Sequence, residues 1–153
     1  MGMFISHSPA QTGELGAAMG RAAWSGLVLA LSGELGAGKT QLVKGIARGL
    51  GIPARVHSPT FNLINSYAGG RLTLFHLDLY RLETRDQIAA AGLEEFLNPK
   101  GVTVIEWAER WFGQVASKTP DEAFEPPFDA LRRVRIEVLS EQERRITYED
   151  LGA

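Results

Sequence analysis

Residues 33–40 read Gly-Glu-Leu-Gly-Ala-Gly-Lys-Thr and match every position of the phosphate-binding pattern G-x-x-x-x-G-K-[ST]. The flanking sequence predicts a strand before this loop and a helix after it. Residues 27–31 form a short apolar run typical of a buried parallel strand. Apolar residues then recur at helical spacing over 42–50, and Gly51 with Pro53 supply a stop signal. The pattern therefore predicts a P-loop that binds a nucleoside triphosphate.

The residue types within the loop suit an anionic ligand. Its glycines let the backbone bend so that several N–H groups turn inward, and the following helix N-terminus adds partial positive charge. We expect Lys39 to reach the β- and γ-phosphates and the Thr40 hydroxyl to ligate Mg²⁺. The expected nucleotide-binding residues are Gly33, Glu34, Leu35, Gly36, Ala37, Gly38, Lys39 and Thr40.

Length and composition narrow the class of protein. The chain has 153 residues, which predicts a single domain over 1–153 with its own core. Its formal net charge of −2 gives no global basic field for broad adhesion to nucleic acid. The absence of cysteine excludes disulfides and thiolate metal sites. No apolar stretch is long enough to span a membrane and no signal peptide opens the chain, so we expect a cytoplasmic protein without membrane association.

The remaining pattern predicts alternating strands and helices that end in a hairpin. Ser8, Pro9 and Gln11 open one helix, which runs to about Trp24. Residues 113–128 are rich in proline and acids and are expected to form a long irregular loop. The other expected elements are a strand over 3–6, a loop leading into a strand over 55–64, a strand over 71–81, a helix over 84–97, a strand over 102–105, and a hairpin of 134–138 with 145–148.

A P-loop enzyme needs a carboxylate near its threonine to hold Mg²⁺, usually at the end of a buried strand. Glu106 ends an apolar strand, although an ordinary surface acid at a strand end is the alternative. Asp78 shares a strand face with His76, although it also fits an edge-strand residue facing water. On the closing hairpin, Arg144 or Arg145 can reach the nucleotide, but solvent exposure is the commoner position for such arginines.

A third candidate element follows the P-loop helix. Ser58, Pro59 and Thr60 are compatible with a switch loop whose hydroxyl senses the γ-phosphate and Mg²⁺. As chemistry alone this signal is weak, because such a tripeptide is more often a plain turn. Trp107 is expected to be a packing residue, and its place beside Glu106 keeps stacking on a base open as the alternative.

Four segments together resemble the TsaE family, formerly called YjeE, whose members are ATPases of threonylcarbamoyladenosine modification in bacterial tRNA. The resemblance covers about residues 3–111 well and the final hairpin more loosely. It implies an α/β fold of the three-layer P-loop NTPase type, with a mixed sheet and a C-terminal antiparallel hairpin. The segments are GELGAGKT at 33–40, HSPTF at 57–61, HLDLYR at 76–81 and VIEW at 104–107.

The resemblance also implies roles for individual residues. Thr40 and Glu106 would bind Mg²⁺ while Lys39 holds the phosphates of ATP. Asp78 would lie near the metal and the attacking water, and Thr60 would belong to the switch loop. These assignments make Asp78, Glu106 and Thr60 the expected catalytic residues.

The implied partners are the TsaB and TsaD proteins, which carry out the transfer to tRNA while the ATPase regulates or resets them. Contact with tRNA itself would be indirect or weak. The sequence offers no obvious arginine finger, so we expect weak ATP hydrolysis alone and stimulation by partners. The family pattern differs here at Gln41, at His57 and in the long segment 113–128.

Two other functions remain open at this point. One is a small-molecule kinase of the P-loop class, which would need an acceptor pocket and an arginine-bearing lid. Arg132, Arg133 and Arg135 instead fall in or beside a predicted strand. The other is a nucleotide-operated binding module in which hydrolysis is too slow to matter.

Overall fold

The computed structural model describes residues 2–34, 37–53, 55–56, 63–80, 82, 84–97, 99–108 and 131–151. In these residues one mixed sheet has the strand order β1-β7-β6-β2-β5-β4-β3. Strand β2 pairs in parallel with β5 and β6, and β4 is parallel to β5, whereas the β3, β7 and β1 pairings are antiparallel. The strands are β1 (Gly2–Ser6), β2 (Val28–Gly33), β3 (Ile64–Tyr67), β4 (Leu74–Asp78), β5 (Val102–Glu106), β6 (Leu131–Val138) and β7 (Arg144–Leu151).

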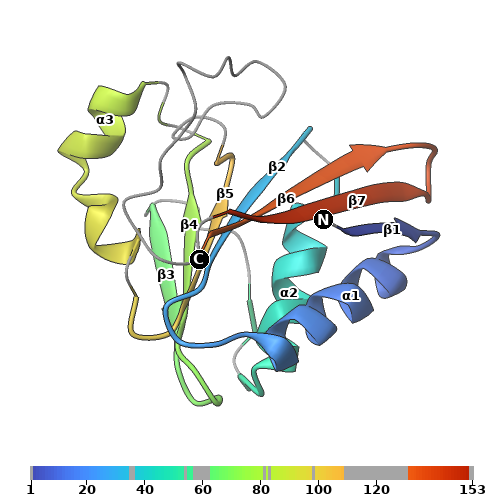
Figure 1. The fold of residues 1–153 in the computed structure, drawn as a ribbon, viewed down its shortest axis with the longest axis horizontal. Coiled ribbons are helices and arrows are strands. Elements are labelled where there is room, and N and C mark those ends of the chain that lie inside the picture. Colours follow the sequence, from blue (N-terminus) through green and yellow to red (C-terminus); the bar gives the residue numbers. More distant parts are fainter. Residues whose placement is uncertain are drawn as a thin grey trace.

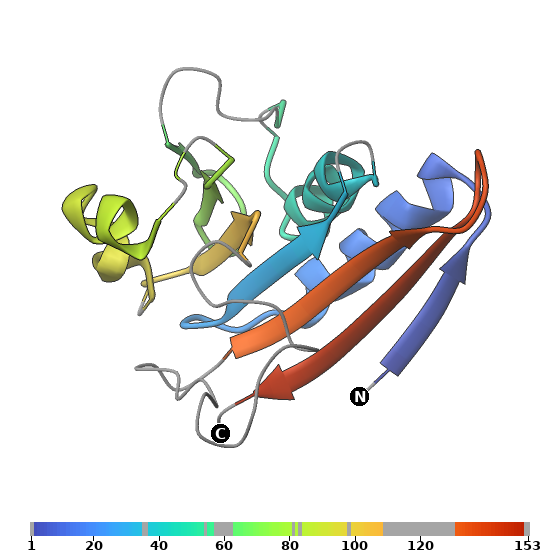
Figure 2. The same cartoon turned by 90° about the horizontal axis from the view of Figure 1, so that it is seen from above.

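Helices cover the two faces of this sheet (Figures 1 and 2). Helices α1 (Pro9–Ala22) and α2 (Lys39–Gly49) pack on one face, where Leu29 and Leu31 of β2 point. Helix α3 (Arg85–Ala90) and the 3₁₀ helix η1 (Leu93–Leu97) pack on the other, with Val28 and Ala30. Because successive strand residues point to opposite faces, the two cores are separate. The three-layer α/β fold with a mixed sheet is confirmed.

The strand register gathers several strand ends at one edge of the sheet. Leu31 of β2 lies opposite Glu106 of β5, which in turn lies opposite Asp78 of β4. The pairings among these strands are parallel, so both acids lie at the edge where β2 enters the P-loop. Strand β6 is also parallel to β2, and Gly33 lies opposite Ile136. The turn between β6 and β7 therefore reaches the same edge.

Helix α2 is fixed against α1 by contact between their backbones. A Cβ on Gly16 of α1 would lie 2.3 Å from the Leu42 carbonyl oxygen of α2. A Cβ on Gly45 of α2 would lie 2.1 Å from the Gly13 carbonyl oxygen of α1. Only residues without a side chain permit this separation. The close approach sets the position of α2, whose first residue is Lys39.

Most predicted elements are present, with differences in extent. The strand expected to end at residue 64 is found, among the described residues, as β3 over Ile64–Tyr67. The strand expected over 71–81 is regular only over Leu74–Asp78. The helix expected over 84–97 starts with the predicted cap, since Thr84 and Gln87 exchange hydrogen bonds. It then stops at Ala90, because Gly92 has a φ of +70° that no α-helix continues, and η1 follows.

The closing hairpin is longer than the predicted pair 134–138 and 145–148. Strands β6 and β7 align over eight residue pairs, from Leu131 opposite Leu151 to Val138 opposite Arg144. The loop expected over 113–128 lies outside the described residues. Among the helices that the structure describes, none is long and apolar enough to cross a membrane.

Candidate nucleotide-binding site

The glycine loop connects the end of β2 to the start of α2, as the sequence predicts. Gly38 is the N-cap of α2 and has a φ of +106°, a left-handed conformation that glycine adopts without steric cost. The Ala37 N–H donates to the Glu34 carbonyl oxygen at 3.0 Å, and Leu42 N–H donates to Gly38 at 3.1 Å. The loop therefore turns directly into the helix. Leu35 and Gly36 lie outside the described residues.

The Lys39 ammonium is buried within this loop. Its Nζ donates to the Gly33 carbonyl oxygen at 2.6 Å and to the Glu34 carbonyl oxygen at 3.1 Å. It also lies 4.0 Å from the centre of the Trp107 ring. A buried cation needs such partners, and carbonyl oxygens and an aromatic face both supply negative potential. Thr40 follows in the first turn of α2 and is partly exposed.

Glu106 is 3% exposed at the end of β5, so it does not occupy the surface position that was the alternative for it. Its Oε2 atom contacts Nε2 of His76 on β4, a residue with no exposed surface. Nδ1 of His76 is buried and has no hydrogen-bond partner among the residues that the structure describes. The contact therefore assigns the ring proton to Nε2, which donates to the carboxylate. The pair holds one carboxylate oxygen of Glu106 in a fixed position.

Asp78 lies beside Glu106 on the neighbouring strand and is half-buried. Burial raises the pKa of Asp78, and the negative charge of Glu106 raises it further. The Tyr80 N–H, which donates to Oδ1 at 3.0 Å, and the charge of Lys39 act to lower the same pKa. Asp78 is thus close enough to Glu106 and Lys39 for both charges to affect its pKa. It is not on an edge strand, because β4 lies between β5 and β3.

Trp107 directly follows Glu106 and has an unusual backbone conformation. Its φ of +59° is rare for a bulky residue and marks local strain, which tends to gather at functional sites. The ring packs against Lys39 and against Tyr80, whose ring centre is 5.2 Å away. The predicted packing role of Trp107 is consistent with these contacts, and its partners are residues of the candidate site.

The oxygen-bearing side chains at this edge fit a metal ion bound together with a nucleotide better than one held by protein side chains alone. The described residues contain no cluster of three His, Cys, Asp or Glu side chains that could hold a metal ion by themselves. In P-loop enzymes Mg²⁺ takes a hydroxyl, a carboxylate, phosphate oxygens and water. Thr40 and Glu106 offer oxygen ligands of that kind at the loop edge. These residues suit a metal bound together with a nucleotide.

The structure brings together most of the residues that the sequence singled out. Lys39, Asp78 and Glu106 lie at one sheet edge, and Thr40 lies at the start of the helix beside them. Thr60 lies outside the described residues, so its role stays a prediction. Sequence reasoning did not identify the contact between His76 and Glu106. Its only signal was that His76 and Asp78 share one strand face.

The strand, glycine loop, helix and strand-end acid together define a protein of the P-loop NTPase type. The sequence profile described as "Threonylcarbamoyl adenosine biosynthesis protein TsaE" matches residues 6–146. The chain belongs to the TsaE family.

Individual relatives agree with this assignment over most of their length. The chain is 41% identical over 143 residues to a tRNA threonylcarbamoyladenosine biosynthesis protein TsaE of Treponema pallidum, covering 94% of this chain and 96% of the relative. It is 39% identical over 127 residues to the TsaE protein of Bacillus subtilis, covering 83% and 72%. The crystal structure of Bacillus subtilis YdiB superposes with a TM-score of 0.72 at 30% identity, covering 99% of this chain and 85% of that one.

Proposed function

We propose that this chain is an ATP hydrolase of tRNA threonylcarbamoyladenosine biosynthesis, and that it regulates or resets the TsaB–TsaD complex. Its membership of the TsaE family supports the pathway, because the relatives carry that biosynthesis in their names. One structural observation supports the chemistry most directly. The buried Lys39 ammonium lies inside a P-loop, and Glu106 and Asp78 end two strands at the sheet edge where that loop begins.

In the proposed bound state, Lys39 exchanges its carbonyl partners for phosphate oxygens of ATP. An ammonium-to-phosphate contact is charge-assisted and stronger than the carbonyl contacts it replaces. Thr40 and Glu106 would hold Mg²⁺, which supplies neutralisation of charge on the β- and γ-phosphates. His76 keeps the Glu106 carboxylate oriented, because a partner that fixes one oxygen limits rotation of the other.

Asp78 is the residue proposed to orient the attacking water. It is half-buried beside Glu106 and is held by the Tyr80 N–H. Its raised pKa favours a group that accepts a proton more readily than an ordinary aspartate. Thr60 is proposed to belong to the segment that senses the γ-phosphate.

We propose that hydrolysis is slow until partners bind. Arg132 donates to Asp150, and Arg144 donates to backbone carbonyl oxygens, so these two side chains are engaged elsewhere than at the γ-phosphate. A finger supplied by a second protein raises the rate of such sites by about 10³–10⁵-fold. We therefore propose that the partner proteins regulate hydrolysis at this same site.

The test is phosphate release by the isolated chain, with and without the TsaB and TsaD proteins. A slow basal rate and clear stimulation are expected, and Thr60→Ala is expected to lose the stimulation before it loses nucleotide binding. A parallel screen of small hydroxylated acceptors distinguishes a kinase, which would transfer the phosphoryl group to one of them. Full-speed hydrolysis that ignores both partners would overturn the proposal.

A further inference from the structure

We infer that Arg144 is a positioning residue of the nucleotide site, because its guanidinium orients a peptide of the P-loop toward the phosphates. This inference rests on the proposed binding of ATP at that loop. It concerns a residue outside the glycine pattern and on the opposite side of β2 from Glu106 and Asp78. The observation that carries it is a hydrogen bond from Arg144 Nε to the Ala37 carbonyl oxygen at 3.0 Å.

The topology explains how a residue so late in the chain reaches the loop. Strand β6 lies next to β2 and is parallel to it, so its final residues pass the start of the glycine loop. Arg144 begins the returning strand β7, where it lies opposite Val138. The chain therefore turns beside the P-loop and brings Arg144 to Ala37. In sequence the two residues are 107 positions apart.

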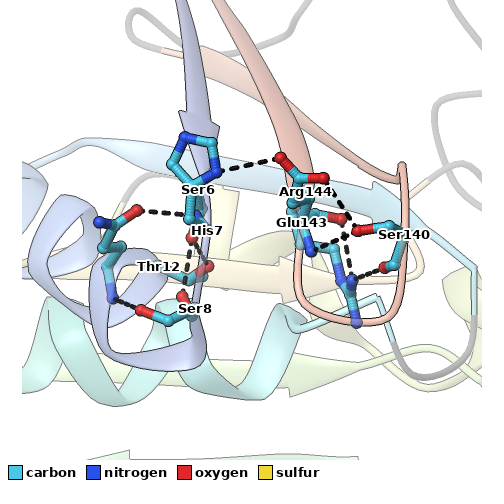
Figure 3. Close-up of polar contacts among 8 residues, drawn as sticks. Ser6, His7, Ser8, Thr12, Ser140, Glu143 and Arg144 are labelled. Atoms are coloured by element: carbon cyan, nitrogen blue, oxygen red, sulfur yellow. Dashed lines mark hydrogen bonds and ion pairs between the residues drawn. The ribbon is translucent and has the colours of Figure 1, made fainter.

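The Arg144 side chain is held in place by the turn that carries it (Figure 3). Its Nη1 donates to the carbonyl oxygens of Ser140 at 2.7 Å and Glu143 at 2.9 Å. The Glu143 side chain accepts from Ser140 Oγ at 3.1 Å and contacts His7 Nδ1 at 3.0 Å. The turn is thereby tied to the junction of β1 and α1. Arg144 is pre-organised, so its contact with Ala37 requires little further loss of side-chain freedom.

Because of the geometry of the peptide unit, the hydrogen bond from Arg144 to the Ala37 carbonyl oxygen also fixes the direction of the Gly38 N–H. The Ala37 carbonyl and the Gly38 N–H belong to the same peptide unit, and no peptide bond among the described residues is cis. In a trans peptide these two groups point in opposite directions. When Arg144 holds the carbonyl on the side of the turn, the Gly38 N–H points away from the turn. Inward-pointing backbone N–H groups are the donors that bind phosphate in such loops.

The peptide that Arg144 contacts joins two residues that are themselves held by the fold, so its orientation is passed directly to the start of α2. The Ala37 side chain has no exposed surface, and Gly38 is fixed as the left-handed N-cap of α2. The guanidinium also adds a positive charge next to the loop. Arg144 thus acts through Ala37 and Gly38, and its contact lies on the carbonyl side of the peptide.

The experiment compares Arg144→Met, Arg144→Lys and Arg145→Met by calorimetric titration with Mg²⁺·ADP. Arg145 is the matched control, because it is the next residue on β7, points to the opposite face and pairs with Glu137 at 3.6 Å. We expect Arg144→Met to bind ADP about tenfold more weakly, since it loses a charge-assisted hydrogen bond and misaligns a phosphate donor. Arg144→Lys should recover part of the affinity, and Arg145→Met should bind like the wild type.

A second measurement separates positioning from general stability. The Gly38 amide proton resonance should shift on ADP binding in the wild type and in Arg145→Met, and the shift should be reduced in Arg144→Met. Wild-type ADP affinity and an unchanged Gly38 shift in Arg144→Met would overturn the inference while leaving the proposed function intact. If Arg144→Met does not fold, Arg144→Lys decides in the same way. Wild-type ADP affinity and a wild-type Gly38 shift in Arg144→Lys would show that the guanidinium group is not needed. If the wild type itself binds no nucleotide, the proposed function and this inference both fail.

Discussion

Replacing a glycine where α1 meets α2 should destabilise the protein by an amount that the structure lets us work out. Alanine at position 16 places a Cβ 2.3 Å from the Leu42 carbonyl oxygen, whereas ordinary non-bonded separations are about 3.5–4.0 Å. The helices must separate by about 1 Å to accept it. Alanine at position 13 of the same helix instead lies at ordinary contact distances, 3.5 Å from the end of the Arg48 side chain and 3.9 Å from the Gln41 carbonyl oxygen.

Both substitutions gain the same helix-propensity free energy. The difference between their free energies of unfolding therefore isolates the steric cost. Each Gly→Ala change in a helix gains about 1 kcal/mol from backbone propensity. Overpacking costs about 1–3 kcal/mol and applies to Gly16→Ala alone. Gly16→Ala should therefore be about 1–3 kcal/mol less stable than Gly13→Ala. For a domain of this size that difference corresponds to roughly 2–12 °C in Tm.

Urea unfolding followed by circular dichroism measures the two free energies of unfolding under identical conditions. Gly13→Ala is expected to equal or exceed the wild type, and Gly16→Ala to fall below Gly13→Ala and to be no more stable than the wild type. Because Leu42 lies in the first turns of α2, Gly16→Ala should also weaken nucleotide binding at Lys39. If Gly16→Ala proves as stable as Gly13→Ala, the backbone contact does not constrain the helices and the reasoning is refuted.

Three further predictions concern the acids and their histidine. Glu106→Ala should weaken Mg²⁺-dependent nucleotide binding, whereas Asp78→Ala should slow turnover more than it weakens binding. Calorimetric titration measures the binding and phosphate release measures the turnover, and a swapped pattern would refute the assignment. Because the folded-state pKa of Asp78 is raised, its stability contribution is fully present below the ordinary value of 3.8 and is lost as pH rises through the folded value. Asp78→Asn should therefore raise the nucleotide-free Tm at pH 7 and lose that advantage near pH 4, and a lower Tm at pH 7 would contradict this. His76→Phe should lower the free energy of unfolding by about 1–3 kcal/mol, because a buried Glu106 oxygen loses its donor; unchanged urea stability would count against the contact.

The sequence predicts the parts of this site that depend on local pattern. The glycine loop needs only a strand before it and a helix after it, and both are visible as apolar periodicity. Glu106 ends an apolar run, and Asp78 follows the alternation of β4, so each could be placed at a strand end or on a face. Such features depend on only a few neighbouring residues, so the sequence predicts them without knowledge of the tertiary fold.

The parts that could not be predicted depend on contacts between distant segments. Gly16 and Gly45 look like weak helix formers in sequence, and only the packing of α1 on α2 shows why no side chain fits there. The contact of His76 with Glu106 requires the register of β4 against β5. The bond from Arg144 to the P-loop requires β6 to lie next to β2, which no local pattern encodes.

The central claim is that this P-loop binds ATP through Lys39, and a direct titration tests it. Mg²⁺·ATP is titrated into the wild type, Lys39→Ala and Lys44→Ala, where Lys44 is the exposed lysine of the same helix. Lys39→Ala should lose a charge-assisted contact of about 1.5–3 kcal/mol and bind at least about tenfold more weakly, while Lys44→Ala binds like the wild type. Unchanged ATP affinity in a folded Lys39→Ala variant would contradict the account.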